Sequence, residues 1–584
     1  MAEREVLTVR EAPDDKLRKH AENRFRAMAE TRKDVDADVY DIAGLCMPSR
    51  SKQIVENYKA IPTSRGGQRK NASSRNTLYD GHAIRSFEIC ANGMLSGLSS
   101  RSQAWFRPTL IDEDLMAYHP VRLWLDDVAT RMYAAFAMSN FYEAALAVYL
   151  EMSAFGTAAD TMVANDQSIS VNHPLTFGEY GLSTGEDGRP SALSRTFTLT
   201  TQQMVEKFVA DRFDSQSLDW SRVTQGVKEA WNGGFYGRAF VVNQLIEENP
   251  AYVPGKLGAI GMRWRSIKWQ PDETTKKKFL CIEGFREQPF MAPRWETLSG
   301  EDWGTGRGKK ALPDMRALQL AAKRSGEAED MAVKPPTFGP PSIDRVSMLP
   351  GSHTAVAAVD MSVGIKPVYE IDPKILSLLD NKIERLHRAV DAMTYADLFM
   401  AITNMDGVQP RNVEELLRRH EEQMTQLGPV IDRANSEFLQ VAFDRMFGIM
   451  ARAGMLPPAP PEIQGMEIKV DFVSVLAQAQ KLLGISQTER SVAFVGNLAA
   501  AFPEAPDNID IDAIIHDYWD RTGAPAAGLR DTKVRDAIRQ GRAQQQQAER
   551  MAAMMPATKD GADAARLLSE ADTGDGSMLQ RLVG

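Results

Sequence analysis

The stretch IDPKILSLLDNKIERLHRAVDAMTYADLFM, residues 371–400, predicts one long helix and decides how the chain around it is arranged. Asp372 can accept a hydrogen bond from a backbone amide of the first turn, and Pro373 is tolerated at the first helical position. Apolar residues then recur at every third or fourth position, which places them on one helical face. These residues are Ile375, Leu379, Ile383, Leu386, Val390 and Met393. The sequence therefore predicts an amphipathic helix with a continuous apolar stripe.

A proline-rich segment precedes this helix, and a polar loop follows it. Residues 334–370 contain KPPTFGPPSIDRVSMLPG and the alternating stretches TAVAAVDM and KPVYEI. Because proline lacks a backbone donor, this composition predicts short strands rather than helix. Upstream of it, a helix is expected to begin at Pro313. Downstream, TNMDGVQPRN at 403–412 contains Gly407 and Pro410, so the chain can reverse direction there.

The rest of the chain alternates between helical and strand periodicity. Long helices are predicted for 14–46, for a segment rich in small residues that ends near Ser99, and for 115–154. Turn residues and alternation predict a small antiparallel sheet at 156–208 and a second β block at 256–295. A helix starting at Asn412 is expected to be kinked at Pro429 and to end near Ala453. A half-buried strand at 466–472 and helices to Met555 complete an α+β fold that is mainly α.

Composition excludes several functional classes. The chain has 584 residues, with 43% hydrophobic and 25% charged residues, which is typical of a soluble protein. A formal net charge of −9 argues against a broad basic surface that coats nucleic acid. The sequence lacks a run of about 18 apolar residues, so we expect no membrane span. The charged beginning MAEREVLTVREAPDDKLRKH favours folding in the cytoplasm.

The sequence also lacks the usual patterns of catalytic or metal sites. None of the eight histidines has a partner at metal-ligand spacing, and His387 and His420 are expected at partly exposed helix positions. GTGRGKK at 304–310 fails the phosphate-loop pattern, because Trp303 and Lys310 occupy positions that require glycine and Ser or Thr. Cys46, Cys90 and Cys281 are expected to be buried reduced thiols. We therefore predict no catalytic residue, metal or cofactor.

Several segments together resemble the head-to-tail connector, or portal, proteins of short-tailed bacteriophages. They occur in the order expected for that family and cover about residues 15–485. The resembling segments are 76–108, 155–164, 188–208, 283–295, 303–318 and 427–481. The sequence departs from the family at Lys309, where a proline-containing turn is usual, and this leaves the local turn open.

The resemblance implies a ring, usually of twelve copies, at one capsid vertex of the virion. Double-stranded DNA passes through such a ring during packaging and ejection. The implied partners are a terminase motor, major capsid and scaffolding proteins, and tail adaptor proteins, with no membrane. The implied parts are an N-terminal region with wing and β insertions (1–312), stem helices (313–333 and 371–400), a clip (334–370), a tunnel loop (401–412), a kinked wing helix with a strand (413–489), a crown (490–555) and a loose tail (556–584).

The resemblance also implies which residues meet DNA and partners. The tunnel-loop candidates are Asn404, Met405, Asp406, Gln409 and Arg411, of which the polar side chains suit phosphate contacts. The stem candidates are Lys374, Lys382, Arg385 and Arg388, and the clip candidates are Phe338, Ile343 and Arg345. The cluster Lys382, Arg385 and Arg388 could form a shallow basic ring or face acidic residues of a neighbouring subunit.

The charges of the stem helix indicate how strongly it would bind DNA. The segment from Asp372 to Phe399 carries four basic and five acidic residues. A mixed wall of this kind favours a conduit over a clamp, because six to ten phosphate contacts would hold DNA tightly. Two alternatives remain open at this stage. One is another structural virion protein, such as a tail adaptor or scaffold-like factor without a channel, and the other is an ATPase that uses GTGRGKK.

Overall fold

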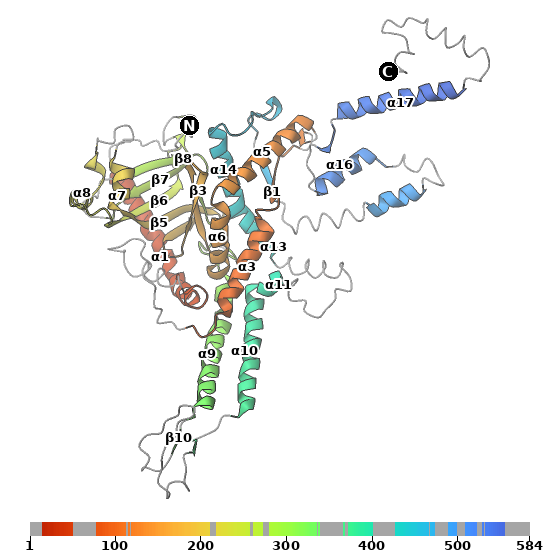
Figure 1. The fold of residues 1–584 in the computed structure, drawn as a ribbon. Helices are drawn as coiled ribbons and strands as arrows, with labels where there is room; N and C mark the ends of the chain where they lie inside the picture. Colours follow the sequence, from red (N-terminus) through yellow and green to blue (C-terminus); the bar gives the residue numbers. More distant parts are fainter. Residues whose placement is uncertain are drawn as a thin grey trace. The chain divides into compact units, whose positions relative to one another are not determined.

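A computed structural model gives the fold of the chain (Figure 1). It describes residues 15–48, 50, 78–112, 115–116, 118–210, 218–256, 261–271, 279–298, 300–335, 337–338, 366–367, 372–400, 427–466, 468–472, 489–498, 509–522, 528–530 and 532–554. The chain divides into two compact units. The larger unit comprises 1–111, 127–459 and 466–484, and the smaller comprises 112–126, 460–465 and 485–584.

The described secondary structure is α+β and mainly helical. The helices are α1 (Asp15–Cys46), α3 (His82–Leu98), α5 (His119–Met138), α6 (Phe141–Phe155), α7 (Thr201–Met204), α8 (Gln225–Asn232), α9 (Arg307–Val333), α10 (Pro373–Thr394), α11 (Ala396–Met400), α13 (Gly428–Ala434), α14 (Gln440–Arg452), α16 (Ile511–Thr522) and α17 (Thr532–Met554). The strands are β1 (Phe106–Thr109), β2 (Ala159–Asn165), β3 (Ile169–Leu175), β4 (Tyr180–Thr184), β5 (Pro190–Thr200), β6 (Ala239–Glu248), β7 (Trp264–Trp269), β8 (Cys281–Phe285), β9 (Phe290–Met291), β10 (Thr337–Phe338), β11 (Lys366–Pro367) and β12 (Lys469–Phe472). The part of the chain that the structure describes contains no helix long and apolar enough to cross a membrane.

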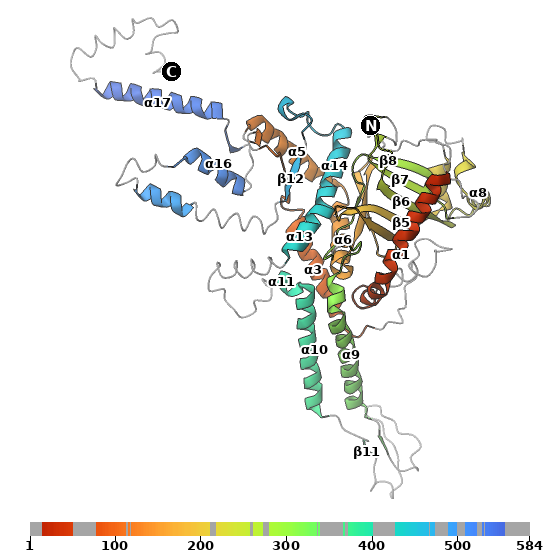
Figure 2. The ribbon, with the colours of Figure 1, turned by 180° about the vertical axis from the view of Figure 1, so that it is seen from behind.

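A five-stranded antiparallel sheet in the order β4-β5-β6-β7-β8 forms the centre of the larger unit. Helix α1 packs on one face, where its Ala21 and Met28 meet Leu245 and Trp269 of the sheet (Figure 2). Strands occur in both predicted blocks, and β7 and β8 flank the predicted turn and pair antiparallel. The prediction of one small sheet at 156–208 is wrong, because β2 and β3 pair with β9 whereas β4 and β5 join β6, β7 and β8. The central strand β6 was not predicted. It pairs with β5 and β7 on its two sides, and its AFVV start is a continuous apolar run that lacks the alternation by which a half-buried strand is recognised.

A smaller sheet and the helices α3 and α6 complete the core of this unit. Strands β3, β2 and β9 form an antiparallel sheet whose apolar residues join one large core cluster with α1, α6 and α9. The small residues of α3 permit close approach, since a Cβ at Gly93 would lie 2.2 Å from Cγ of Phe399 in α11. The predicted end of α3 is confirmed, with Ser99 at its C-cap. All three cysteines are buried and free, as predicted.

Helices α9 and α10 lie side by side and antiparallel (Figures 1 and 2), and we call this pair the arm. The predicted start of α10 is confirmed, because the Asp372 carboxylate accepts from the Lys374 amide at 2.9 Å and Pro373 occupies the first turn. The predicted start of α9 at Pro313 is wrong. The helix begins at Arg307, and Pro313 lies inside it. A proline there removes one amide donor, and packing of Ala311 and Leu312, just before it, into the core outweighs that loss.

The short strands β10 and β11 pair antiparallel between the two helices of the arm in sequence. The predicted strand KPVYEI is thus observed at Lys366–Pro367. The predicted strand at 354–361 lies outside the described residues.

Pro429 was predicted to kink a helix, but it lies at the start of a described helix. The described helix α13 begins at Gly428, so Pro429 occupies its first turn, where a missing amide is tolerated. The irregularity lies further on, in a π-helical turn at Asn435–Leu439 that leads into α14. The predicted strand near 466–472 is confirmed, since β12 pairs with β1, and Val470 and Phe472 are half-buried while Lys469 and Asp471 are exposed.

The smaller unit contains a helical segment at 489–498 together with α16 and α17. Arg539 donates to both carboxylate oxygens of Asp512 at 2.6 Å, which ties α17 to the start of α16. The prediction of helix in this region is confirmed for the described residues. The predicted loose tail at 556–584 lies outside them.

Candidate functional site

The four predicted basic residues of α10 all lie exposed on the arm. Lys374, Lys382, Arg385 and Arg388 fall within an arc of about 120°, given about 100° of rotation per helical residue. Arg388 lies 3.6 Å from Glu384, but both side chains are mostly exposed, so this pair contributes little. The arm therefore presents a basic face whose charges are available to a partner.

The acidic residues and the apolar stripe of α10 occupy separate arcs, whereas Leu378 lies within the arc of the basic residues. Asp380, Glu384 and Asp391 cluster within an arc of about 40° that is distinct from the basic face. Helix α10 thus carries a basic, an acidic and an apolar side.

The apolar stripe of α10 is buried only toward its C-terminal end. Val390 belongs to the main core, with Ile383 and Leu386 packed against it. Ile375 is 49% exposed, and its neighbour Leu378 is 66% exposed. Helix α9 likewise exposes Leu320, Met331 and Val333. The first half of α10 and the facing end of α9 therefore expose apolar surface that the subunit itself does not cover.

The structure describes only one of the remaining predicted site residues. Phe338 lies in β10, whereas Ile343 and Arg345 lie outside the described residues. The five tunnel-loop candidates, Asn404, Met405, Asp406, Gln409 and Arg411, also lie outside them. The prediction of one long helix over 371–400 is wrong, because Tyr395 adopts a left-handed backbone conformation (φ 63°) that separates α10 from the short helix α11. Residues 401–426, which follow α11, lie outside the described residues.

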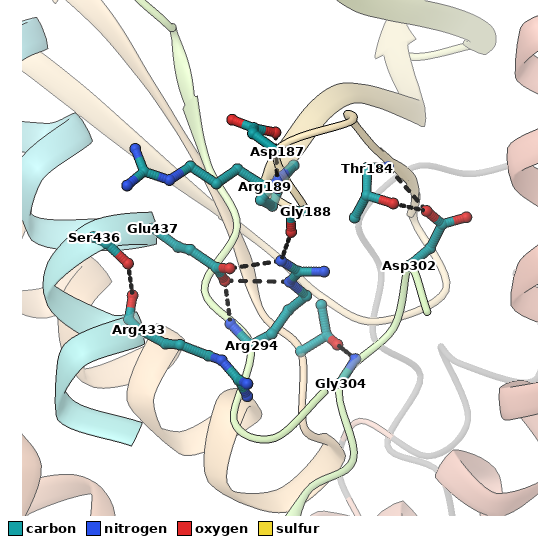
Figure 3. Close-up of polar contacts among 12 residues, drawn as sticks. Thr184, Asp187, Gly188, Arg189, Arg294, Asp302, Gly304, Arg433, Ser436 and Glu437 are labelled. Carbon is teal, nitrogen blue, oxygen red and sulfur yellow. Dashed lines mark hydrogen bonds and ion pairs between the residues drawn. The ribbon is translucent and has the colours of Figure 1, made fainter. Parts of the chain in front are cut away.

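A buried ion pair that the sequence did not reveal joins β-structure to the π-helical turn (Figure 3). The side-chain Nη2 of Arg294 donates to Glu437 Oε1 at 2.6 Å, and its Nε and backbone amide donate to Oε2 at 3.2 and 3.0 Å. Arg294 also donates to the carbonyl of Gly188 at 2.5 Å and to that of Glu301 at 3.3 Å. The side chains of Arg294 and Glu437 are only 3% and 6% exposed. Their contacts connect the chain segments that contain Arg294, Glu437 and Gly188.

The glycines of GTGRGKK allow two backbone segments to approach closely. The Gly304 amide donates to Thr157 Oγ1 at 2.8 Å, and a Cβ at Gly306 would lie 2.4 Å from the backbone nitrogen of Gly156. The two lysines have carboxylate partners, Lys309 with Asp38 at 2.9 Å and Lys310 with Glu296. Residues 304–306 of this segment therefore pack closely against the backbone at Gly156 and Thr157. Lys309 lies in the first turn of α9, where the proline usual in the resembling family would also be tolerated.

Two buried carboxylates are the most strongly perturbed acids of the larger unit. Burial raises the pKa of Glu151 to about 7, although Arg50 and the Phe177 amide favour its charged form. Burial likewise raises the pKa of Asp160 to about 6, against a hydrogen bond from Asn172. Both have protein partners, so their arrangement is explained by packing.

The described residues contain no group of three or more His, Cys, Asp or Glu side chains placed to hold a metal ion. What they do contain is an arm with segregated charge, exposed apolar side chains at its end, and buried ion pairs that connect distant segments. These features define the class of an assembly protein, whose surfaces are built for other macromolecules.

Comparison with known proteins identifies the family. Residues 18–529 match the family model described as bacteriophage head to tail connecting protein. The chain is 34% identical over 514 residues to the portal protein of Salmonella phage epsilon15, covering 87% of this chain and 89% of that protein. It is 33% identical over 505 residues to the probable portal protein of Bordetella phage BPP-1, covering 85% and 87%.

A chain from the virion of a native gene transfer agent particle is a more distant structural match, with a TM-score of 0.28 and 11% identity. It covers 70% of this chain and 96% of that one, and a score of this size supports no argument about the fold.

The chain belongs to the bacteriophage head-to-tail connecting, or portal, protein family. It is accordingly a structural component of a phage virion and not an enzyme.

Proposed function

We propose that copies of this chain form a ring, of twelve subunits, that conducts double-stranded DNA through one capsid vertex. The arm supplies the stem of each subunit, and the basic face of α10 lies toward the DNA. The observation that carries this proposal is the surface of the arm, on which exposed basic and exposed apolar side chains occur on one pair of helices.

The exposed apolar residues support contacts between copies. Ile375 on α10, with Leu320 and Val333 on α9, would each lose apolar surface to a neighbouring arm. Burial of such side chains contributes about 25 cal/mol per Å² of apolar area, and a ring repeats that gain at every interface. The acidic side of α10 can also meet basic groups of the next subunit, a contact of the kind that sets register.

The basic face supports transient contact with DNA. Four cations on each α10, a helix that also carries acids on a separate side, attract phosphate without forming the many simultaneous contacts that hold DNA tightly. Residues 401–412 would extend this lining as a tunnel loop, with Asn404, Gln409 and Arg411 toward phosphates. Residues 334–370 would form the clip that meets the terminase and later the tail proteins, and 490–555 would form the crown.

A substitution on the arm tests ring formation. Ile375→Glu places a charge on the apolar stripe, at a side chain that is 49% exposed, so the subunit should fold normally while the ring dissociates. Leu298→Glu is the matched control, because Leu298 is 72% exposed and lies outside the arm. Size-exclusion chromatography with light scattering should give subunits for the first variant and rings for the second. Intact rings with Ile375→Glu would contradict the placement of the arm at the interface.

A second experiment tests DNA conduction separately from assembly. Deletion of residues 404–409 should leave the ring intact and reduce packaging or retention of DNA. Rings that fail to form after this deletion would refute the assignment of the loop. A combined Lys382→Glu, Arg385→Glu and Arg388→Glu variant should lower packaging, and the conservative Lys382→Arg, Arg385→Lys and Arg388→Lys variant should restore it. Equal packaging by both would mean that these residues face neighbouring subunits.

A further inference from the structure

The C-terminal end of α10 is joined to the start of α3 by two crossed histidine–aspartate contacts. His82 Nε2 lies 2.9 Å from Asp391 Oδ1, so a histidine of α3 meets an aspartate of α10. His387 Nε2 lies 2.8 Å from Asp80 Oδ2, so a histidine of α10 meets an aspartate just before α3. We call these four residues the brace.

The two halves of the brace are in contact with each other. The rings of His82 and His387 stack with centroids 4.0 Å apart and planes inclined by 18°. Their side chains are 21% and 29% exposed, so solvent screens the cluster only in part. Because the rings stack, displacement of one histidine disturbs the hydrogen bond of the other.

Helix α9 joins the same cluster through Gln319. Its Nε2 donates to the Asp80 carbonyl at 2.6 Å, and its Oε1 accepts from the amides of Tyr79 at 2.8 Å and Asp80 at 3.2 Å. On the other side, Ser86 Oγ donates to Asp391 Oδ1 at 2.6 Å. Both helices of the arm are thus tied to the segment that begins α3, next to the main core.

These contacts change the pKa values of His82 and Asp391. The hydrogen bond to Asp391 raises the pKa of His82, and burial opposes it. Burial disfavours the charged form of Asp391, yet the hydrogen bonds from His82 and Ser86 outweigh that effect and hold the pKa of Asp391 below its usual range. Protonated His82 would form an ion pair with the Asp391 carboxylate, whereas neutral His82 leaves that carboxylate without a cationic partner in the brace.

Other charged groups reach the cluster from each element packed against it. Arg85 of α3 disfavours the charged form of His82, and Asp80 favours it. Asp397 of α11 interacts unfavourably with Asp391. Lys323 of α9 lies 5.9 Å from the centroid of the Tyr79 ring, adjacent in sequence to the brace. Asp391 and Asp80 favour the protonated form of His82, and Arg85 opposes it.

We propose that the brace is a proton-dependent joint that holds the arm on the core of the subunit and loosens as the solution becomes alkaline. Because the pKa of His82 is raised in the folded protein, its stabilisation is complete below the unfolded value of about 6.5 and is lost as pH rises through the folded value. The pKa of Asp391 is shifted in the opposite direction, so its contribution to stability is lost only as pH falls below about 4. The joint is therefore tightest between about pH 4 and 6.5. This inference does not depend on the ring.

Hydrogen–deuterium exchange of the full-length protein tests the joint locally. After correction for intrinsic exchange rates, amides of 82–90 and 383–394 should exchange several-fold faster at pH 8.5 than at pH 6, because the contact between protonated His82 and Asp391 is lost. His82→Gln and Asp391→Asn retain hydrogen-bonding groups that do not titrate, so their exchange should not change with pH. His20→Gln, at a histidine that contacts Glu247 outside the brace, should behave like the wild type.

Two results would overturn the proposal. One is equal protection of these segments in the wild type at both pH values. The other is a pH response that survives in His82→Gln, or in Asp391→Asn should the first variant not fold.

Discussion

Removal of Glu437 should destabilise the larger unit far more than loss of an exposed ion pair. In Glu437→Ala, the Arg294 guanidinium would keep its carbonyl acceptors but would lie buried without a carboxylate, since its side chain is only 3% exposed. Breaking a buried pair in this way costs about 3–5 kcal/mol. The exposed pair Lys310–Glu296 supplies the control, because Glu296→Gln should cost less than about 1 kcal/mol.

The double variant Arg294→Met with Glu437→Leu separates charge from hydrogen bonding. It removes both charges, so most of the loss should be recovered. Glu437 also accepts the Arg294 backbone amide at 3.0 Å, and that buried donor would remain unpaired, which leaves a loss of about 1–3 kcal/mol. Urea unfolding followed by tryptophan fluorescence is a suitable assay, because the buried Trp295 is the next residue. A loss below about 1 kcal/mol in Glu437→Ala would refute the account of this junction.

Two further predictions concern the core. Glu151→Gln should flatten the fall of melting temperature between pH 5 and 8, because burial raises the pKa of Glu151 to about 7 and its ionisation opposes folding above the ordinary value of 4.5; an unchanged slope would contradict this. Gly93→Ala should cost about 1–3 kcal/mol through the clash with Phe399, whereas Gly97→Ala, with nothing within 4 Å, should stabilise its helix by about 0.5–1 kcal/mol; thermal unfolding that shows equal effects at the two positions would exclude the close contact.

Local signals in the sequence were sufficient for several elements. The Asp372-Pro373 start of α10, the end of α3 at Ser99 and the half-buried strand β12 each depend on neighbouring residues only, and each is observed. Local signals failed where tertiary packing decided the outcome. Proline at position 313 favours a helix start, but the preceding turn packs into the core and extends α9 to Arg307.

The contacts that connect the site could not be predicted, because they join residues far apart in the chain. Arg294 and Glu437 are separated by 143 positions, and His82 and Asp391 by 309. The sequence placed His387 on a helix at a partly exposed position, which is correct, but nothing in its neighbourhood indicated Asp80 as its partner. Arg294 and Glu437 do lie in segments that resemble the portal family, although that resemblance does not pair them.

The most direct test of the proposed function is an image of the purified assembly along its axis. Cryo-electron microscopy of the full-length protein should show a closed ring with a central opening wide enough for a DNA duplex, with α10 of each subunit lining it. A solid particle, or a chain that stays monomeric both in solution and in the assembled virion, would contradict the account.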